Sequence, residues 1–144
     1  MEDPERVAEF LTSVPLFRSL KRRQIERLAV RFVRRKYAAG QDIVVQGQSG
    51  IGLFILVSGK AEAIRVHTDG TKMVVNTFGP TDFFGELALL DDAPRTASVV
   101  ATADCECLAL TQWEFLSALR EDADMAIVIL QEMARRFRRT LNTF

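Results

Sequence analysis

From Phe32 to Leu110 the sequence consists of short stretches rich in valine, isoleucine and phenylalanine, separated by glycines. The stretches expected to form strands are 32–37, 43–46, 53–57, 61–67, 72–78, 96–101 and 105–110. The intervening glycines are Gly40, Gly47, Gly50, Gly52, Gly59 and Gly70. Asp69 followed by Gly70 is typical of a hairpin turn. Strands this short, at this spacing, predict an all-β barrel or sandwich.

Helical patterns precede and follow the strands. Asp3 and Pro4 are expected to open the first helix, and Ser19 to cap the second. The expected helices are 4–14, 20–30, 112–119 and 122–143. We therefore expect a single mainly β domain with flanking helices over 1–144: N-terminal helices at 1–31, strands at 32–111 and C-terminal helices at 112–144.

Composition excludes several classes of function. Hydrophobic residues make up 48% of the chain and the formal net charge is zero, which favours a soluble globular protein without an overall basic field for nucleic acid. Basic residues are concentrated between Lys21 and Lys36, and in four arginines between 135 and 139. We interpret both runs as solvated helix faces; a contact surface for an acidic partner is the alternative.

The chain offers little for membranes, metals or catalysis. No apolar run approaches the ~18–20 residues of a membrane span and no cationic leader is present, so we expect no membrane segment and a cytoplasmic protein. Cys105 and Cys107 are two residues apart, a poor spacing for a disulfide, and are expected to be core thiols. His67 is the only histidine and no nucleophile–base pair is recognisable, so we expect neither a metal nor an enzyme.

The chemically most informative stretch is 83–99. Helix-forming residues at 86–90 follow Gly85, so a short helix is expected to open there with unpaired backbone N–H groups, which bind anions. Arg95 can bring a planar, permanently charged donor group to the same anion. Glu86 is suited to accept hydrogen bonds from hydroxyls. An anion with adjacent hydroxyls on one small ligand describes a sugar phosphate.

This stretch resembles the phosphate-binding cassette of cyclic nucleotide-binding domains, whose pattern is roughly Phe-Gly-Glu-Leu-Ala-Leu, a variable turn, then Pro-Arg-x-Ala-Ser/Thr-Val. The resemblance covers nearly the whole chain. It implies a double-stranded β-helix (a jelly-roll-like β-roll) with N-terminal helices and a C-terminal B/C helix pair. It also implies a 3′,5′-cyclic nucleotide as ligand, with cAMP favoured, cGMP as the alternative and no metal. The ligand-binding residues that it implies are Phe84, Gly85, Glu86, Leu87, Ala88, Arg95, Thr96, Ala97 and Thr140.

By this resemblance Arg95 clamps the ligand phosphate and Glu86 receives the ribose 2′-hydroxyl. Gly85, Leu87 and Ala88 allow close backbone approach and supply N–H groups. Considered as residues alone, Arg95 could instead form a structural salt bridge, and Glu86 could cap its own helix. Both interpretations stay open at this point.

Two threonines stand apart. Thr96 is either a simple strand former or, by the resemblance, a hydroxyl that bonds the guanine amino group of a syn cyclic GMP, and it leaves the choice of base open. Thr81 departs from the family, which usually has a glycine in the loop before the cassette. The departure puts the conformation of that loop in question, outside the anion site.

Near the C-terminus, residues at alternating steps of three and four predict a short heptad seam. They are Leu130, Met133, Phe137, Thr140 and Phe144. The Met-Ala-Arg-Arg-Phe run that begins at Met133 resembles the C-helix of catabolite-activator-type regulators. This implies that Thr140 contacts the purine across a homodimer seam. Leu141 stands where those regulators have a serine.

We therefore expect a regulatory sensor in which a bound nucleotide repositions the C-terminal helix. One alternative is a dimerisation or docking scaffold that does not depend on nucleotide. Another is the sensor half of a transcription regulator, although no DNA-binding domain fits within these residues. The sequence does not indicate a downstream protein partner.

Overall fold

The structure, a computed structural model, describes residues 3–48, 52–85, 90 and 94–142. The chain forms two compact units. The helical unit combines both ends of the chain, Met1–Arg31 and Trp113–Phe144, and the β unit is the continuous stretch Phe32–Gln112.

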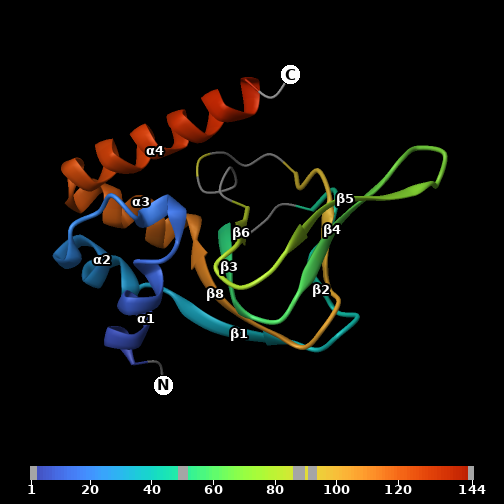
Figure 1. The fold of residues 1–144 in the computed structure, drawn as a ribbon, viewed down its shortest axis with the longest axis horizontal. Helices are drawn as coiled ribbons and strands as arrows, with labels where there is room; N and C mark the ends of the chain where they lie inside the picture. Colours follow the sequence, from blue (N-terminus) through green and yellow to red (C-terminus); the bar gives the residue numbers. More distant parts are fainter. Residues whose placement is uncertain (1–2, 49–51, 86–89, 91–93, 143–144) are drawn as a thin grey trace. The chain divides into compact units, whose positions relative to one another are not determined.

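The β unit consists of two four-stranded sheets whose paired strands are antiparallel (Figure 1). The strand order is β1-β8-β3-β6 in one sheet and β2-β7-β4-β5 in the other. The strands are β1 (Val33–Tyr37), β2 (Asp42–Val44), β3 (Gly52–Ser58), β4 (Ala61–Val66), β5 (Lys72–Phe78), β6 (Phe83–Phe84), β7 (Ser98–Ala101) and β8 (Cys105–Thr111). The expected fold class, mainly β with flanking helices, is confirmed.

The core of the β unit is built from alternate residues of these strands, because successive side chains of a strand point to opposite faces. Its buried members are Ile43, Phe54, Leu56, Ala61, Ala63, Phe84, Val99, Ala101, Cys105, Cys107 and Ala109. Both cysteines are free thiols in this core, as expected. Burial raises the pKa of Cys107 to about 12, with a further contribution from Cys105.

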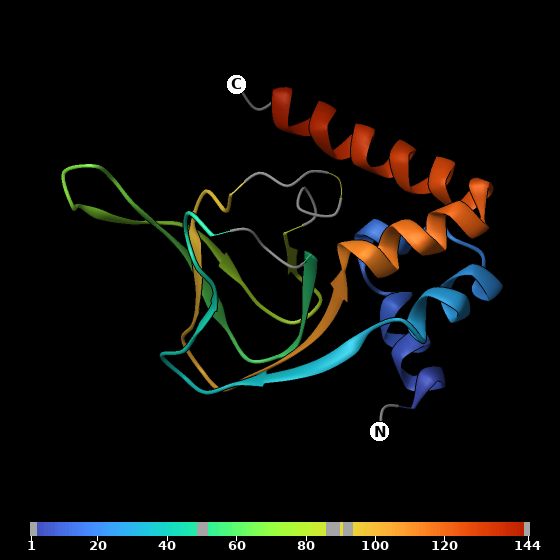
Figure 2. The same ribbon diagram turned by 180° about the vertical axis from the view of Figure 1, so that it is seen from behind.

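The turn between β4 and β5 is the expected hairpin, which extends well beyond the other strands in both views (Figures 1 and 2). Gly70 takes a φ of 88°, and its N–H donates to the carbonyl of His67. Asp69 accepts from the backbone N–H of Thr71 at 2.9 Å and from its hydroxyl. Glycine at a positive φ and a carboxylate that bonds two residues ahead are the turn chemistry that the sequence predicts.

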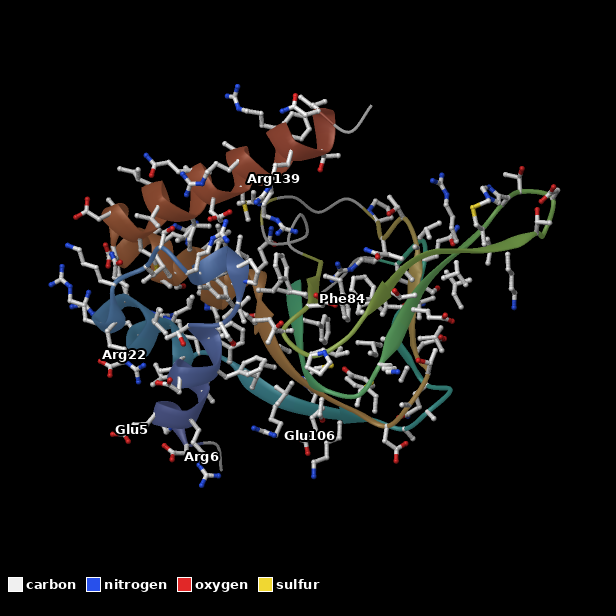
Figure 3. All side chains as sticks on the ribbon, in the orientation of Figure 1. Glu5, Arg6, Arg22, Phe84, Glu106 and Arg139 are labelled. Carbon is white, nitrogen blue, oxygen red and sulfur yellow. The ribbon has the colours of Figure 1, made fainter. Side chains whose placement is uncertain are left out.

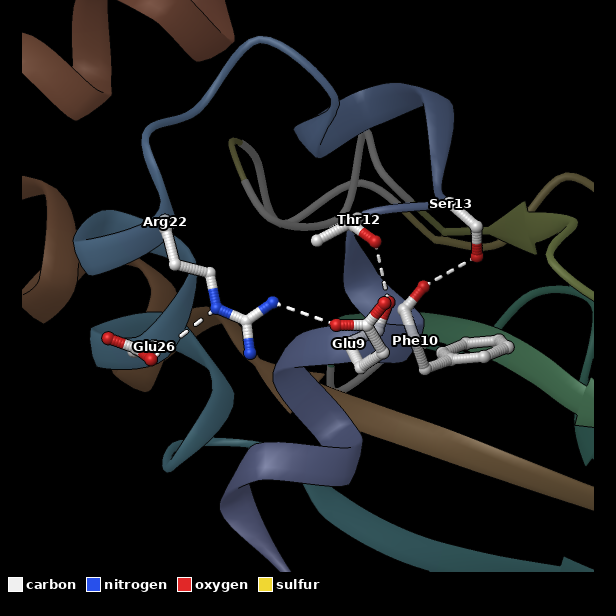
Figure 4. Close-up of polar contacts among 6 residues, drawn as sticks. All are labelled: Glu9, Phe10, Thr12, Ser13, Arg22 and Glu26. Carbon is white, nitrogen blue, oxygen red and sulfur yellow. Dashed lines mark hydrogen bonds and ion pairs between the residues drawn. The ribbon is translucent and has the colours of Figure 1, made fainter.

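The helical unit contains α1 (Pro4–Leu11), the 3₁₀ helix η1 (Pro15–Phe17), α2 (Arg22–Ala29), α3 (Gln112–Glu121) and α4 (Ala123–Leu141). The first residue of α3, Gln112, is counted with the β unit. Asp3 caps α1 as expected: its carboxylate accepts from the N–H of Glu5 at 3.0 Å. At the other end of α1, the hydroxyls of Thr12 and Ser13 donate to the carbonyls of Glu9 and Phe10, which ends the helix before Pro15 (Figure 4).

The expected cap of the second helix is wrong by two residues. The N-cap of α2 is Lys21, whose backbone N–H donates to Oε1 of Gln24 at 2.9 Å. The side-chain amide of Gln24, in the first turn of the helix, thus accepts from the backbone N–H of the N-cap residue. The helix therefore starts without a cap from Ser19. Asp122 caps α4 by accepting from the N–H of Met125 at 3.1 Å. That bond, together with Gln24 and the nearby Arg27 and Arg23, lowers the pKa of Asp122.

The basic run between residues 21 and 36 is largely tied up in ion pairs. Arg22 pairs with Glu9 and Glu26 (Figure 4), and Arg31 pairs with Glu114 and Glu121. The other pairs are Arg27–Asp122, Arg34–Glu106 and Lys36–Glu106. Most of these acids come from distant parts of the chain. The pairing favours solvated helix faces over a surface for an acidic partner.

The loop before β6 keeps a glycine-like conformation without the glycine. Thr81 has a φ of 73°, the one positive φ at a non-glycine residue among those the structure describes. Its N–H donates to the carbonyl of Leu56 at 2.8 Å, and Leu56 in turn donates to the carbonyl of Asp82. These bonds hold the loop on β3 and force a β-branched residue into a region that such residues avoid.

We expect Thr81→Gly to stabilise the protein. Removing the left-handed strain gains about 1–2 kcal/mol, and the greater freedom of glycine in the unfolded chain offsets about 0.5–1 kcal/mol. Chemical denaturation should therefore show a rise of about 0.5–1 kcal/mol in the free energy of unfolding. Thr77→Gly, inside β5, is the matched control and should lower it. A lower free energy of unfolding for Thr81→Gly would show that the threonine side chain stabilises the fold by more than its strained backbone conformation costs.

Among the described residues, no helix is long and apolar enough to cross a bilayer.

Candidate functional site

Part of the cassette can be described directly. Phe84, Gly85, Arg95, Thr96 and Ala97 are described residues of the β unit. Glu86, Leu87 and Ala88 lie outside the described residues, so the expected helix at 86–90 and their roles remain predictions.

Arg95 is held at both its backbone and its side chain. Its N–H donates to the carbonyl of Gln48 at 2.9 Å, and its carbonyl accepts from the N–H of Gly47 at 2.8 Å. The guanidinium Nη2 donates to the carbonyl of Gly52 at 2.7 Å. Since Gly52 begins β3, the side chain of the arginine is fixed to the start of a central strand of one sheet, and its backbone continues into β7 of the other sheet. The side chain is half-buried and its orientation is set before any ligand arrives.

Gly85 lies directly against this guanidinium. Its φ is 86°, and a Cβ built on it would lie 2.4 Å from Nη1 of Arg95 and 2.5 Å from the carbonyl oxygen of Gly52. Only glycine can take this backbone conformation and leave this space. The fold therefore brings together the glycine and the arginine, which are ten residues apart, as the anion-site hypothesis requires.

Gly52 is the component that the sequence did not single out. Its φ is 150°, and a Cβ there would lie 2.0 Å from the carbonyl oxygen of Leu110 on β8. The glycine was interpreted only as a strand separator, because its close approach to β8 depends on the pairing of Gly52 with Thr111, 59 positions away. The available signal in the sequence was the position of Gly52 directly before the apolar run 53–57, because a glycine within a strand often marks a close approach of another backbone.

Phe84 contributes to the core. Its ring, labelled in Figure 3, stacks on Phe54 with 5.5 Å between centroids and is tilted against Phe78 with 5.1 Å between centroids. With 6% of its surface exposed, the side chain anchors the start of the cassette inside the β unit. Only its backbone is suited to a ligand contact.

The residues after Arg95 differ in exposure. Thr96 is exposed, so its hydroxyl is accessible, whereas Ala97 is half-buried and packs against the core. Ser98 begins β7, and its Oγ accepts from the N–H of Gln46 at 2.8 Å. This bond adds a further tie between the 46–48 segment and the end of the cassette.

Thr140 belongs to the helical unit. It is exposed on α4, and its hydroxyl donates to the carbonyl of Arg136 at 3.1 Å. The hydroxyl oxygen keeps its acceptor capacity. The purine contact inferred from the resemblance remains a prediction.

The exposed apolar side chains of α4 form a stripe that differs from the expected seam. They are Ile127, Leu130, Phe137 and Leu141. With the exposed Ala134 they follow steps of three, four, three and four, which is the heptad spacing. The expected seam shares Leu130 and Phe137 with this stripe, but it places Met133 and Thr140 where the exposed stripe has Ala134 and Leu141. Phe144 lies outside the described residues.

The part of the chain that the structure describes contains no group of three or more histidine, cysteine, aspartate or glutamate side chains that could hold a metal ion.

Comparison with known proteins identifies this arrangement. Residues 34–122 match the family described as "Cyclic nucleotide-binding domain". The cyclic AMP receptor protein of Thermus thermophilus is 36% identical over 124 residues, which are 86% of this chain and 57% of that protein. The curated relatives that the chain matches are longer, and it spans 24% to 60% of their length.

Two solved structures have the same fold. The N-terminal domain of a transcriptional regulator from Streptomyces coelicolor superposes with a TM-score of 0.83 at 30% identity, covering 91% of this chain and 94% of that one. The regulatory domain of Toxoplasma gondii PKA, solved with cAMP, gives a TM-score of 0.75 at 30% identity over 82% of this chain and 46% of that one. The match of the family over most of the chain, on the fold and cassette described above, shows that this chain belongs to the cyclic nucleotide-binding domain family.

Proposed function

We propose that this chain binds a 3′,5′-cyclic nucleotide at the cassette 83–99 and acts as a regulatory sensor without catalysis. The observation that carries the proposal is the guanidinium of Arg95, which hydrogen bonds the carbonyl of Gly52 and lies against Gly85. A positively charged, preoriented fork beside a glycine without a side chain suits a singly charged cyclic phosphate. No metal takes part.

We favour cAMP over cGMP as the ligand. Two similar proteins are named for it or were solved with it, the Thermus thermophilus receptor and the Toxoplasma gondii regulatory domain. The exposed hydroxyl of Thr96 keeps cGMP as the alternative, since it could bond the guanine amino group. In this proposal Glu86 accepts the ribose 2′-hydroxyl, and Leu87 and Ala88 donate backbone N–H groups to the phosphate.

The output is a change in the position of α4. The apolar stripe of Ile127, Leu130, Phe137 and Leu141 is exposed and is suited to pack on a purine or on the α4 of a second copy. A nucleotide that favours one position of α4 shifts the population toward it, and the difference in affinity between the two positions limits the shift. Thr140 would contact the purine in the favoured position, and the working form would be a cytoplasmic homodimer.

A second candidate is the sensor half of a longer transcription regulator. The Streptomyces coelicolor domain, which is 30% identical and is almost fully covered by this chain, is the N-terminal domain of such a regulator. Nucleotide binding is the same in both candidates; only the recipient of the signal differs. A nucleotide-independent scaffold is the competing function, and the intact Gly85–Arg95 arrangement argues against it.

Titration calorimetry of the nucleotide-stripped protein tests the binding step. We expect saturable binding of cAMP, weaker binding of cGMP and a clear loss of affinity for 2′-deoxy-cAMP, by about 1.5–3 kcal/mol for the missing hydrogen bond to the charged carboxylate of Glu86. Equal affinity for the deoxy analogue would remove Glu86 from the site. No heat and no thermal shift with either nucleotide would overturn the proposal in favour of the scaffold.

A further inference from the structure

The helical unit contains a buried carboxylate that lies outside the proposed nucleotide site. Glu132, in the middle of α4, has a side chain only 1% exposed. Three arginines approach it: Arg18 at 3.3 Å, Arg135 at 3.5 Å and Arg139 at 3.6 Å. We call these four residues the Glu132 cluster. A carboxylate this deeply buried is stable only when opposite charge and hydrogen bonds compensate for its lost hydration.

The three arginines are not equivalent. Arg135 and Arg139 lie on α4 itself, one and two turns beyond Glu132, and Arg139 is seen on that helix in Figure 3. Arg18 is the C-cap of η1, 114 positions away in the sequence, and its Nε donates to Oε1 of Glu132. Among the described residues, Arg18 is thus the partner in the cluster that links α4 to another element.

The burial along α4 gives this link its importance. Met125, Ile129 and Glu132 are the buried residues of the helix, on one face at steps of four and three. Between 133 and 142 no described residue is buried. Glu132 is therefore the last buried residue of α4 among those the structure describes, and it is ionic where the two buried residues before it are apolar.

We propose that the Glu132 cluster is a conformational anchor: the ion pair between Arg18 and Glu132 holds the middle of α4 on η1 and sets how readily the helix detaches. Breaking one partner leaves a buried charge short of compensation, which is far more destabilising than losing an exposed pair. The device is built from residues of the helical unit alone and does not depend on the proposed ligand.

Amide hydrogen exchange of the nucleotide-free protein tests the anchor. We expect Arg18→Gln to accelerate exchange of the α4 amides around Ile129–Arg136 by about tenfold or more, and to leave the amides of β3 unchanged. Arg138→Gln is the matched control, because Arg138 is an exposed arginine of the same helix with no ion pair to Glu132. It should change exchange by less than about twofold.

Glu132→Gln and the double variant complete the cycle. If the two side chains act as a pair, the double variant should exchange no faster than the faster single variant. Exchange rates in Arg18→Gln within about twofold of the unmodified protein, or a double effect equal to the product of the single effects, would overturn the proposal. Should Glu132→Gln prevent folding, the comparison of Arg18→Gln with Arg138→Gln decides alone.

Discussion

Arg95→Ala is expected to lower the affinity for the cyclic nucleotide by about 2–3 kcal/mol, or roughly 30- to 150-fold, because it removes the charged hydrogen bonds that we propose Arg95 makes to the phosphate. The arginine needs no reorganisation to make them. Its backbone is bonded to Gly47 and Gln48, and its guanidinium to the carbonyl of Gly52. Titration calorimetry on the stripped protein, with the nucleotide that binds the unmodified chain, measures the loss.

The control is Arg65→Ala, since Arg65 is an exposed arginine of the same unit outside the cassette. It should leave affinity unchanged. Arg95→Lys should fall between the two, because lysine keeps the charge but loses the planar fork. Thermal unfolding of each variant separates lost binding from lost folding. Arg95→Ala with unaltered affinity would remove the arginine from the site and leave it a structural role.

Gly52→Ala is expected to lower the free energy of unfolding by about 3 kcal/mol or more, from the combined cost of overpacking and of an unsuitable φ. A Cβ at this position would lie 2.0 Å from the carbonyl oxygen of Leu110 and 3.0 Å from Cα of Thr111, both of them backbone atoms that cannot turn aside. Strands β3 and β8 would have to separate. Nucleotide affinity should fall as well, because the carbonyl of Gly52 positions Arg95.

Gly40→Ala is the matched control for this prediction. Gly40 also has a positive φ, 91°, but a Cβ there would meet no atom within 4 Å. Gly40→Ala should therefore lower the free energy of unfolding by about 1 kcal/mol, from backbone strain alone. Chemical denaturation of both variants isolates the steric contribution. Equal losses for the two would show that β3 yields to the methyl group and that the approach to β8 is not tight.

The β unit could be predicted well because its signals are local. Glycines and β-branched residues mark turns and strands within a few positions, and seven of the eight strands among the described residues were expected near their observed bounds. The two-residue strand β6 was not expected separately, because Phe83–Phe84 is too short to show a period. The cap of α2 was predicted at the wrong residue because Gln24, inside the helix, accepts from the N–H of Lys21, whereas Ser19 was expected to cap the helix.

The residues of the cassette motif could be predicted from the sequence, but the residue that holds the Arg95 side chain in place could not. Gly85 and Arg95 follow from the cassette pattern. Gly52 does not, because its role comes from strand pairing across the unit. The register of the α4 stripe was also undetermined. The expected and observed seams share Leu130 and Phe137, and only the exposure of the side chains between them shows which register faces outward.

The helical unit is assembled from the two ends of the chain, and this has a consequence for how the protein forms during synthesis. Residues up to Arg31 leave the ribosome 82 positions before Trp113, a wait of roughly 4–16 s at ordinary translation rates. The β unit emerges in that interval. Meanwhile Arg18 at the end of η1, Gln24 in α2 and Arg31 just after α2 lack their partners Glu132, Asp122 and Glu114. The nascent chain therefore carries an incomplete helical unit until the residues from Trp113 onward have been synthesised.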